Sequence, residues 1–339
     1  MPESDADEEA GTPSEGDHAD VEPAEHSILV LLQMGSGPGS SLNRTVVQDI
    51  IQQMGGLSVT RSAGSRVDVW IDSPGGDAHA AYKLGLYLRS RYETVVFVIM
   101  DYAKSAATLL SLSADRIYMA PAAELGPLDT QESREGEVRM RSLLDTAESI
   151  DTIFTQAFVN AIQAGGYVLT STALTREQTI AHVLDFAAQF SRPLLEQIDP
   201  IAVNAANTSL NVASEYGARL LSYRSGRDGL ARAKSQTDQL VRQYPTHGYV
   251  IDRDEAREVL SLPVVDIEGY ELLAPLEDMY SRVQKSEINV ITLLDASQFQ
   301  PSATTSNDEG ESDGDEADDS VDGVQHPSVN SVAESGAGL

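Results

Sequence analysis

Two neighbouring stretches decide the fold of this chain: VDVWIDSPGGDAHAAYKLGLYLRS at residues 67–90 and TVVFVIMDYAKSAATLLSLSADRIYMAPAAELGPLDTQ at residues 94–131. In each, an apolar run typical of a strand ends in a turn of small residues and passes directly into a segment with helical character. Such corners lie at the carboxyl ends of parallel strands, where α/β sheets bind their ligands. We therefore predict an α/β domain with two corners facing each other at one sheet edge.

Strands and helices alternate outward from these stretches. Residues 27–34 predict a buried strand and residues 42–54 a helix that ends at Gly55 and Gly56. Within the two stretches, the same reasoning predicts alternating strands and helices, the order expected of βαβ units. These elements are strands at 67–71, 94–100 and 117–119 and helices at 78–90 and 106–114.

The pattern becomes helical from Arg139 to about Gln243. We predict a helix stop at Gly165 and Gly166, and a later helix that begins with a capping box between Thr175 and Gln178. An apolar run at residues 289–294 predicts an edge strand. The second half of the chain is thus expected to be mainly helical.

The two ends of the chain carry most of its acidity. The net charge is -30, and residues 1–26 and 300–339 each hold ten acidic residues and no Lys or Arg, so residues 27–299 keep 33 acids and all 23 basic residues. Both ends are poor in large apolar residues and are predicted to be disordered. The chain shows no basic cluster, so nucleic acid is not an expected partner.

Composition also excludes several kinds of chemistry. The chain has no cysteine, which excludes disulfides, thiolate nucleophiles and cysteine-ligated metals. No spacing of His and carboxylates suggests a metal site, and we expect no cofactor. No apolar run reaches the roughly 20 residues of a membrane span, and the N-terminal residues lack the pattern of a secretory signal. We therefore expect a cytoplasmic protein, with no indication of membrane association.

Ser105 is the residue in these stretches with the clearest chemical role. Hydrolysis by a serine needs a base for the hydroxyl proton and donors for the developing oxyanion. A serine at a helix N-terminus has the next backbone N–H beside it, and Gly75 and Gly76 let bare backbone approach a substrate. The alternative is that Ser105 only caps its helix.

The SPGG corner, the serine 29 residues after Gly76 in AKSAAT, and the LGPLDTQ segment resemble the ClpP and signal-peptide-peptidase (SppA) superfamily. The closest resemblance is to its serine dehydrogenase proteinase family. The resemblance is strong over residues 67–131 and weaker through SRPLLEQIDP (191–200) and THGYVID (246–252). It implies a ClpP/crotonase-like spiral of βαβ units with a mainly helical C-terminal extension.

The resemblance also implies the site residues. Ser105 is the nucleophile, and the backbone N–H groups of Gly76 and Ala106 form the oxyanion hole. ClpP-type enzymes place a histidine in the segment where this chain has LGPLDTQ, and SppA-type enzymes use a lysine that this chain lacks between Ser105 and Lys234. The order Ser, Asp, His ascribed to the serine dehydrogenase proteinases instead maps onto Ser105, Asp129 and His247.

Other residues remain alternatives. Asp129 could bond only local backbone, and His247 could only line its loop. His79 and Lys83 are rival bases because their helix begins at the glycine corner. Lys104 is expected to point to the other face of its strand, and His182 to be packed within a helix.

The expected function is a serine peptidase that hydrolyses peptide bonds through an acyl-enzyme on Ser105. Its substrates would be peptides or unfolded proteins, and relatives of this fold imply a homo-oligomer. Two other functions stay open: a crotonase-like enzyme acting on an acyl-CoA, and a catalytically silent binding or scaffold protein. We divide the chain into a disordered acidic arm (1–26), an α/β catalytic core (27–138), a helical extension that completes the site (139–299) and a disordered acidic tail (300–339).

Overall fold

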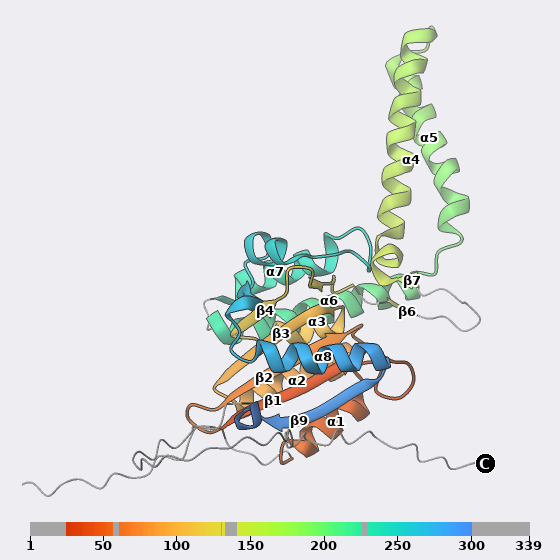
Figure 1. Ribbon diagram of the computed structural model, residues 1–339. Coiled ribbons are helices and arrows are strands. Elements are labelled where there is room, and N and C mark those ends of the chain that lie inside the picture. Colours follow the sequence, from red (N-terminus) through yellow and green to blue (C-terminus); the bar gives the residue numbers. More distant parts are fainter. Residues whose placement is uncertain (1–24, 57–60, 130, 133–140, 226–228, 300–339) are drawn as a thin grey trace, which may run out of the picture.

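The computed structural model describes residues 25–56, 61–129, 131–132, 141–225 and 229–299 (Figure 1). Residues 1–24 of the predicted acidic arm and the whole of the predicted tail lie outside this part of the chain. Their disorder stays a prediction.

A seven-stranded sheet forms the centre of the molecule. Its strand order is β8-β4-β3-β2-β1-β9, with β5 pairing the end of β3. All of these pairs are parallel except that of β1 with β9, which is antiparallel. The strands are β1 (His26–Gln33), β2 (Arg66–Ser73), β3 (Thr94–Ala103), β4 (Arg116–Met119), β5 (Glu124–Leu125), β8 (Val264–Asp266) and β9 (Asn289–Asp295). The predicted parallel-rich α/β fold is therefore confirmed, with β9 at an edge as expected.

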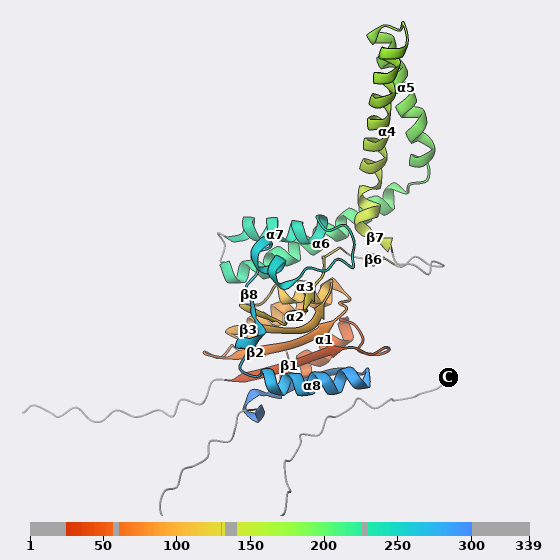
Figure 2. The same cartoon turned by 45° about the horizontal axis from the view of Figure 1, so that its top comes forward.

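Helices cover both faces of this sheet, in agreement with the apolar character of the strands. One face carries α1 (Arg44–Gln53), α2 (Ala78–Arg91) and α3 (Ala106–Ser111), and the other carries α8 (Leu273–Ser286) (Figures 1 and 2). Successive side chains of a strand point to opposite faces. Leu29 and Leu31 accordingly pack with the first set of helices, whereas Ile28 and Val30 pack toward α8.

The segment after the sheet core is mainly helical, as predicted. It contains a small hairpin of β6 (Gln131–Glu132) and β7 (Arg141–Ser142), followed by α4 (Leu143–Ser171), α5 (Arg176–Leu195), α6 (Pro200–Ser225) and α7 (Leu230–Arg242). Helices α4 and α5 project from the body as a hairpin, and α6 and α7 pack on the core (Figure 1). No helix within the described ranges combines the length and apolar content that a membrane span requires.

The predicted helix stop at Gly165 and Gly166 is wrong, because α4 continues to Ser171. A Cβ on Gly165 would lie 2.5 Å from Val183 Cγ2, so this glycine lets α5 approach α4 closely. Packing between helices thus outweighs the low helix propensity of glycine. The predicted capping box between Thr175 and Gln178 is confirmed at the start of α5.

The chain then returns to the sheet. A short π-helix (Glu255–Val259) precedes β8, a 3-10 turn (Ile267–Gly269) precedes α8, and a second 3-10 turn (Ala296–Phe299) follows β9. Tyr270 anchors this return, since its hydroxyl accepts a hydrogen bond from Trp70 Nε1 at 2.7 Å and donates one to Asp68 Oδ2 at 2.8 Å. Strands β8 and β9 therefore belong to the same sheet as residues 27–138, although they lie far along the chain.

Candidate active site

Ser105 lies between β3 and α3 in a strained backbone conformation. Its φ is 51° and its ψ is -116°, a region that costs a residue with a side chain on the order of 1–3 kcal/mol. The surrounding bonds hold it there: Lys104 N–H donates to Ser73 O at 3.0 Å, and Leu109 N–H donates to Ser105 O at 2.9 Å. Ser105 Oγ accepts no hydrogen bond from the first turn of α3, all of which the structure describes. The side chain therefore does not cap its helix.

The glycine corner lies directly against Ser105. A Cβ on Gly75 would lie 2.5 Å from Lys104 O, 2.9 Å from Ala106 N and 3.0 Å from Ser105 Cβ. Gly75 has a φ of +98°, so both its conformation and its surroundings require glycine. The two strand-to-helix corners thus meet at the carboxyl edge of the sheet.

Two backbone N–H groups at this meeting point have no hydrogen-bond acceptor within the described ranges. Gly76 has a φ of +143°, and a Cβ there would lie 2.1 Å from Leu42 O. Leu42 bonds the residues on both sides of Gly76. Its N–H donates to Gly75 O, and its oxygen accepts from Asp77 N–H. Among the described residues, neither Gly76 N–H nor Ala106 N–H donates a hydrogen bond. Both are thus free to bind a ligand oxygen.

Asp129 and His247 form a close pair although 118 residues separate them. His247 Nδ1 lies 2.6 Å from Asp129 Oδ1, and Ser142 Oγ donates to Asp129 Oδ2 at 2.9 Å. Asp129 is buried, whereas the side chain of His247 is 22% exposed. Since a carboxylate only accepts hydrogen bonds, Nδ1 carries the proton and Nε2 is left as an acceptor in the neutral ring.

The contact with Asp129 changes the pKa of His247. The hydrogen bond to Asp129 raises the pKa of His247, against the opposing effects of partial burial and of the nearby Lys104 charge. The structure therefore brings together two of the three residues predicted as a triad. Asp129 does not merely bond local backbone.

A ladder of backbone contacts ties this pair to Ser105. Ala103, two residues before Ser105, is paired with Leu125 in the β3–β5 ladder. Leu125 in turn forms an antiparallel bridge with Ile251, with N–O distances of 2.9 and 3.1 Å. Asp129 follows Leu125 by four residues and His247 precedes Ile251 by four. All three segments therefore leave the same edge of the sheet.

Lys104 fastens these three segments to one another. Its Nζ donates to Leu125 O and to Tyr249 O, each at 3.1 Å, and pairs with Glu124 Oε1 at 2.8 Å. A Cβ on Gly126 would lie 2.6 Å from Lys104 Cδ, so the glycine leaves room for this side chain. No hydrogen bond joins Ser105 Oγ to His247, both of which are described.

The rival bases have other surroundings. His79 is exposed, and its Nδ1 lies 3.0 Å from the hydroxyl of Tyr216 on α6. Lys83 is exposed on α2. His182 is exposed on α5, so the prediction that it is packed is wrong.

Residues 57–153 match the family model of the ClpP-like SDH-type serine proteinases. This part of the chain is similar to that family. It contains Ser105, Gly76, Ala106 and Asp129, and it ends before His247. The resemblance inferred from the sequence is thereby confirmed for the segment that holds both corners.

Curated relatives match over a shorter length. Two uncharacterized proteins of Methanocaldococcus jannaschii are each 37% identical over 65 residues, which is 19% of this chain and 22% and 23% of the relatives. The match thus spans less than a quarter of those proteins.

Two solved structures of the 1510-N membrane-bound stomatin-specific protease are also similar. One is a serine-to-alanine variant and the other a lysine-to-alanine variant in complex with a substrate peptide. Each is 14% identical to this chain, with TM-scores of 0.39 and 0.40. The comparisons cover 74% and 75% of this chain and 85% and 80% of theirs.

One buried carboxyl near this ClpP-like corner was not foreseen from the sequence. Asp72 ends the pairing of β2 with β1, three residues before Gly75, and its Oδ2 accepts from Tyr280 OH at 2.9 Å. Its Oδ1 has no partner among the described residues. Burial raises the pKa of Asp72 to about 7, with a smaller contribution from Asp101. Alternation along β2 turns Asp72 toward α8, and only the fold shows that Tyr280 meets it there.

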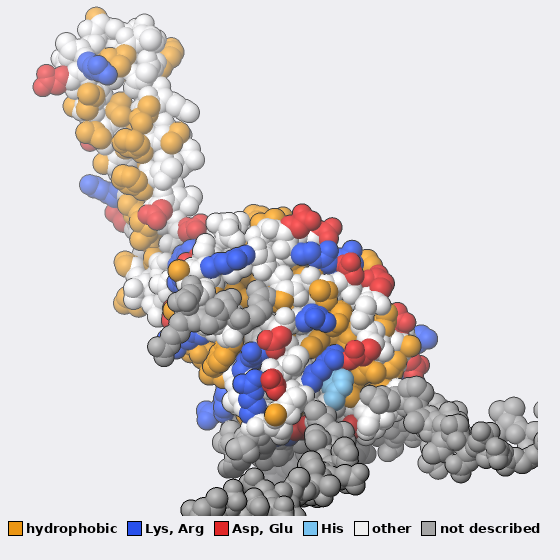
Figure 3. Space-filling model, turned by 90° about the vertical axis from the view of Figure 1, so that its left-hand side faces the viewer, with side chains coloured by type: hydrophobic (Ala, Val, Ile, Leu, Met, Phe, Trp, Pro, Cys, Tyr) orange, Lys and Arg blue, Asp and Glu red, His pale blue; other side chains and the backbone are white. Residues whose placement is uncertain are grey.

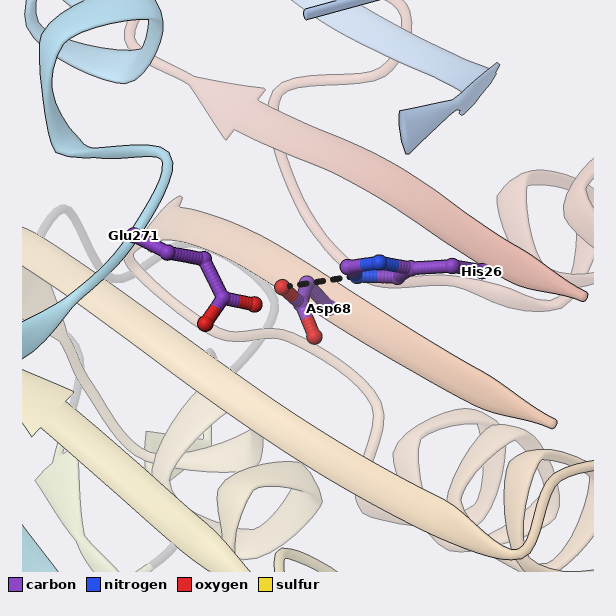
Figure 4. A group of neighbouring side chains, drawn as sticks. All are labelled: His26, Asp68 and Glu271. Atoms are coloured by element: carbon purple, nitrogen blue, oxygen red, sulfur yellow. Dashed lines mark ion pairs between the residues drawn. The ribbon is translucent and has the colours of Figure 1, made fainter. Parts of the chain in front are cut away.

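A second cluster, remote from Ser105 in the chain, has donor atoms of the kind that bind metals. His26 Nε2, Asp68 and Glu271 lie within 4.8 Å of one another among the described residues (Figure 4). Arg66, however, bonds both oxygens of Asp68 and pairs with Glu271 at 2.6 Å. Burial opposes ionisation of Asp68, but its bonds to His26, Arg66 and Tyr270 keep its pKa below the usual range. We interpret this cluster as an ion-pair network that ties the return segment to the sheet.

Proposed function

We propose that this chain hydrolyses peptide bonds with Ser105 as nucleophile, His247 as general base and Asp129 as the residue that orients the base. The family of residues 57–153 supports a serine peptidase in general. The finer assignment rests on one observation: the Asp129–His247 pair is tied through Leu125 and Lys104 to the backbone beside Ser105.

In this scheme, Ser105 Oγ attacks the carbonyl carbon of the substrate while its proton passes to Nε2 of His247. The carbonyl oxygen becomes an oxyanion that accepts hydrogen bonds from Gly76 and Ala106 N–H. Collapse of this intermediate breaks the C–N bond, and the imidazolium gives its proton to the leaving amine. Water then gives a proton to His247 and attacks the acyl carbon. Collapse of this second intermediate breaks the bond between the acyl carbon and Ser105 Oγ, which recovers the proton from His247 as the second product leaves.

The negative charge of Asp129 favours this route at two points. It holds the proton on Nδ1, which leaves Nε2 free to act as the base, and it stabilises the imidazolium formed after proton transfer. The raised pKa of His247 reflects the same interaction. Ser105 and His247 lack a hydrogen bond here, and catalytic hydrogen bonds often tighten only when substrate binds.

The remaining expectations belong to this proposal. Peptides or unfolded proteins are the substrate class, and the acidic core still argues against nucleic acid. The peptidase family favours peptide chemistry over the acyl-CoA alternative, and Lys104, the cation beside the corner, is already paired with Glu124. A homo-oligomer, a cytoplasmic location and the division into core (27–138) and extension (139–299) stay predictions.

Labelling with a fluorophosphonate probe tests the assignment. We expect the native chain to be labelled, Ser105→Ala to be unlabelled, and His247→Gln to be labelled roughly 10⁶-fold more slowly, the cost of losing a triad histidine. His79→Gln is the matched control, since it removes the rival histidine, and it should label at the native rate.

Three outcomes would contradict the proposal. Labelling of Ser105→Ala at the native rate would remove the nucleophile. Native labelling of His247→Gln together with loss in His79→Gln would transfer the role of base to His79. A folded native chain that neither labels nor cleaves unfolded protein would favour the silent scaffold.

A further inference from the structure

The α4–α5 hairpin carries most of the exposed large hydrophobic side chains of the molecule. It projects away from the sheet and its covering helices (Figures 1 and 2). Among the described residues, fourteen of the twenty exposed large hydrophobic side chains lie on it, and hydrophobic atoms follow its length (Figure 3). These are Ile150, Phe154, Phe158, Val159, Ile162, Tyr167, Leu169, Leu174, Ile180, Leu184, Phe186, Phe190, Leu194 and Leu195. Such a concentration marks an interaction surface.

The hairpin cannot bury these side chains by itself. Its two helices meet through small residues, with Ala157, Ala161 and Gly165 buried on α4. Large residues lie outside this contact. They form a stripe along α4 at every fourth position, Ile150, Phe154, Phe158 and Ile162. An apolar stripe of this kind is what one helix of a bundle presents to another.

The charge pattern points to a second copy of this chain as the partner. Two copies with a net charge of -30 each repel one another. A contact between them is therefore most favourable through a surface that carries no charged side chains. Residues 152–175, which form most of α4 and the tip of the hairpin, contain no Asp, Glu, Lys or Arg. We propose that two copies pair through their hairpins, tip to base, as an antiparallel four-helix bundle.

The remaining charges of the hairpin favour the antiparallel arrangement. Asp145, Glu148 and Asp151 lie in the first turns of α4 at the base, whereas Arg176 and Glu177 begin α5 at the tip with charges that offset each other. Parallel pairing would bring the acidic bases of both copies together. Antiparallel pairing instead places the acids of each base beside a tip whose Arg176 and Glu177 balance in charge. It also holds the two acidic bodies at opposite ends of the bundle, whose longer helix α4 spans about 43 Å.

The surface is large enough for a stable pair. Aromatic side chains bury about 150–250 Å² each, so the five aromatic and nine smaller aliphatic side chains, each about half exposed, supply on the order of 800 Å² per partner. That is the amount a standard interface buries on each side. Polar side chains such as Gln156 and Asn160, which bond each other at 2.9 Å, suit a water-accessible bundle rim better than lipid.

Sedimentation of the full chain over a concentration series tests the pairing. We expect a monomer–dimer equilibrium whose dissociation constant rises roughly 30-fold in Phe158→Asp and in Ile162→Asp, the effect of losing an interface hot spot. Val259→Asp is the matched control, because Val259 is 63% exposed outside the hairpin and should leave the constant unchanged. Far-ultraviolet circular dichroism confirms that each variant is folded.

Disulfide cross-linking tests the orientation. Because the chain has no cysteine, only the introduced cysteines can form disulfides. Glu148 is exposed near the base and Ser171 near the tip. Tip-to-base pairing predicts that an oxidised mixture of Glu148→Cys and Ser171→Cys forms mainly mixed disulfides, because bridged Cα atoms lie within about 7 Å.

Several results would overturn the proposal. These are a monomer at every concentration, a dimer that Phe158→Asp does not weaken, or mainly Glu148→Cys homodimers. Flotation with phosphatidylcholine vesicles that requires Phe158, without self-association, would instead assign the hairpin to a lipid surface.

Discussion

Gly75→Ala is the sharpest perturbation of the proposed site, because the structure gives the displacement it would force. The new Cβ would lie 2.5 Å from Lys104 O and 3.0 Å from Ser105 Cβ. To restore an ordinary contact of 3.4 Å, Lys104 O must retreat by about 0.9 Å and Ser105 Cβ by about 0.4 Å. Both shifts act directly on the nucleophile.

Two costs follow from this substitution. The left-handed conformation at φ +98° costs an alanine roughly 1–2 kcal/mol of folding free energy, and the clash adds about 1–3 kcal/mol. A misplacement of 1 Å lowers the rate about 100-fold, so the shift of about 0.4 Å at Ser105 Cβ should lower it roughly 10-fold. We therefore expect labelling by the fluorophosphonate to slow by roughly that factor in protein that is still folded.

Gly56→Ala separates the two costs. Gly56 has a φ of +81°, and nothing lies within 4 Å of a Cβ built there, so it carries the conformational cost without the clash. We expect it to lower the midpoint of urea unfolding slightly while labelling at the native rate. If Gly75→Ala labelled as fast as Gly56→Ala, the reasoning that Gly75 positions Ser105 would be refuted.

Three further predictions follow from the site. Asp129→Asn should lower the rate roughly 10⁴-fold and shift the acid limb of the kcat/KM profile to lower pH, because removing the carboxylate lowers the pKa of His247; an unmoved limb would contradict the pairing. Lys104→Met should reduce kcat about 10–100-fold with little change in KM, and Lys104→Arg should recover part of it, because Nζ positions the loop before Tyr249; equal kcat in Lys104→Met and native protein would argue against that role. Asp72 has a folded-state pKa raised to about 7, so the folded state binds a proton that the unfolded state has lost between about pH 4 and 7. The free energy of unfolding should therefore fall as pH rises through this window, and in urea titrations Asp72→Asn should lose that slope; an unchanged slope would contradict the buried assignment.

The sequence by itself determined the two corners and their local chemistry. Apolar strands that end in SPGG and AKSAAT dictate strand-to-helix turns through short-range preferences alone. Glycine is needed where φ is positive, and a helix that starts at Ala106 leaves its first N–H unpaired. Because these features depend on neighbours within a few residues, the order of elements around Ser105 could be predicted.

Tertiary structure decided everything that depends on distant segments. Asp129 meets His247 only because Leu125 pairs with Ile251 across more than 100 residues, and no local pattern encodes that bridge. The role of Lys104 in fastening the same segments could not be predicted either, since two of its three partners are backbone oxygens. Gly165 shows the reverse case, in which a local stop signal gave way to close helix packing against Val183. Local preferences are worth about 1 kcal/mol, and burial of neighbouring elements outweighs them.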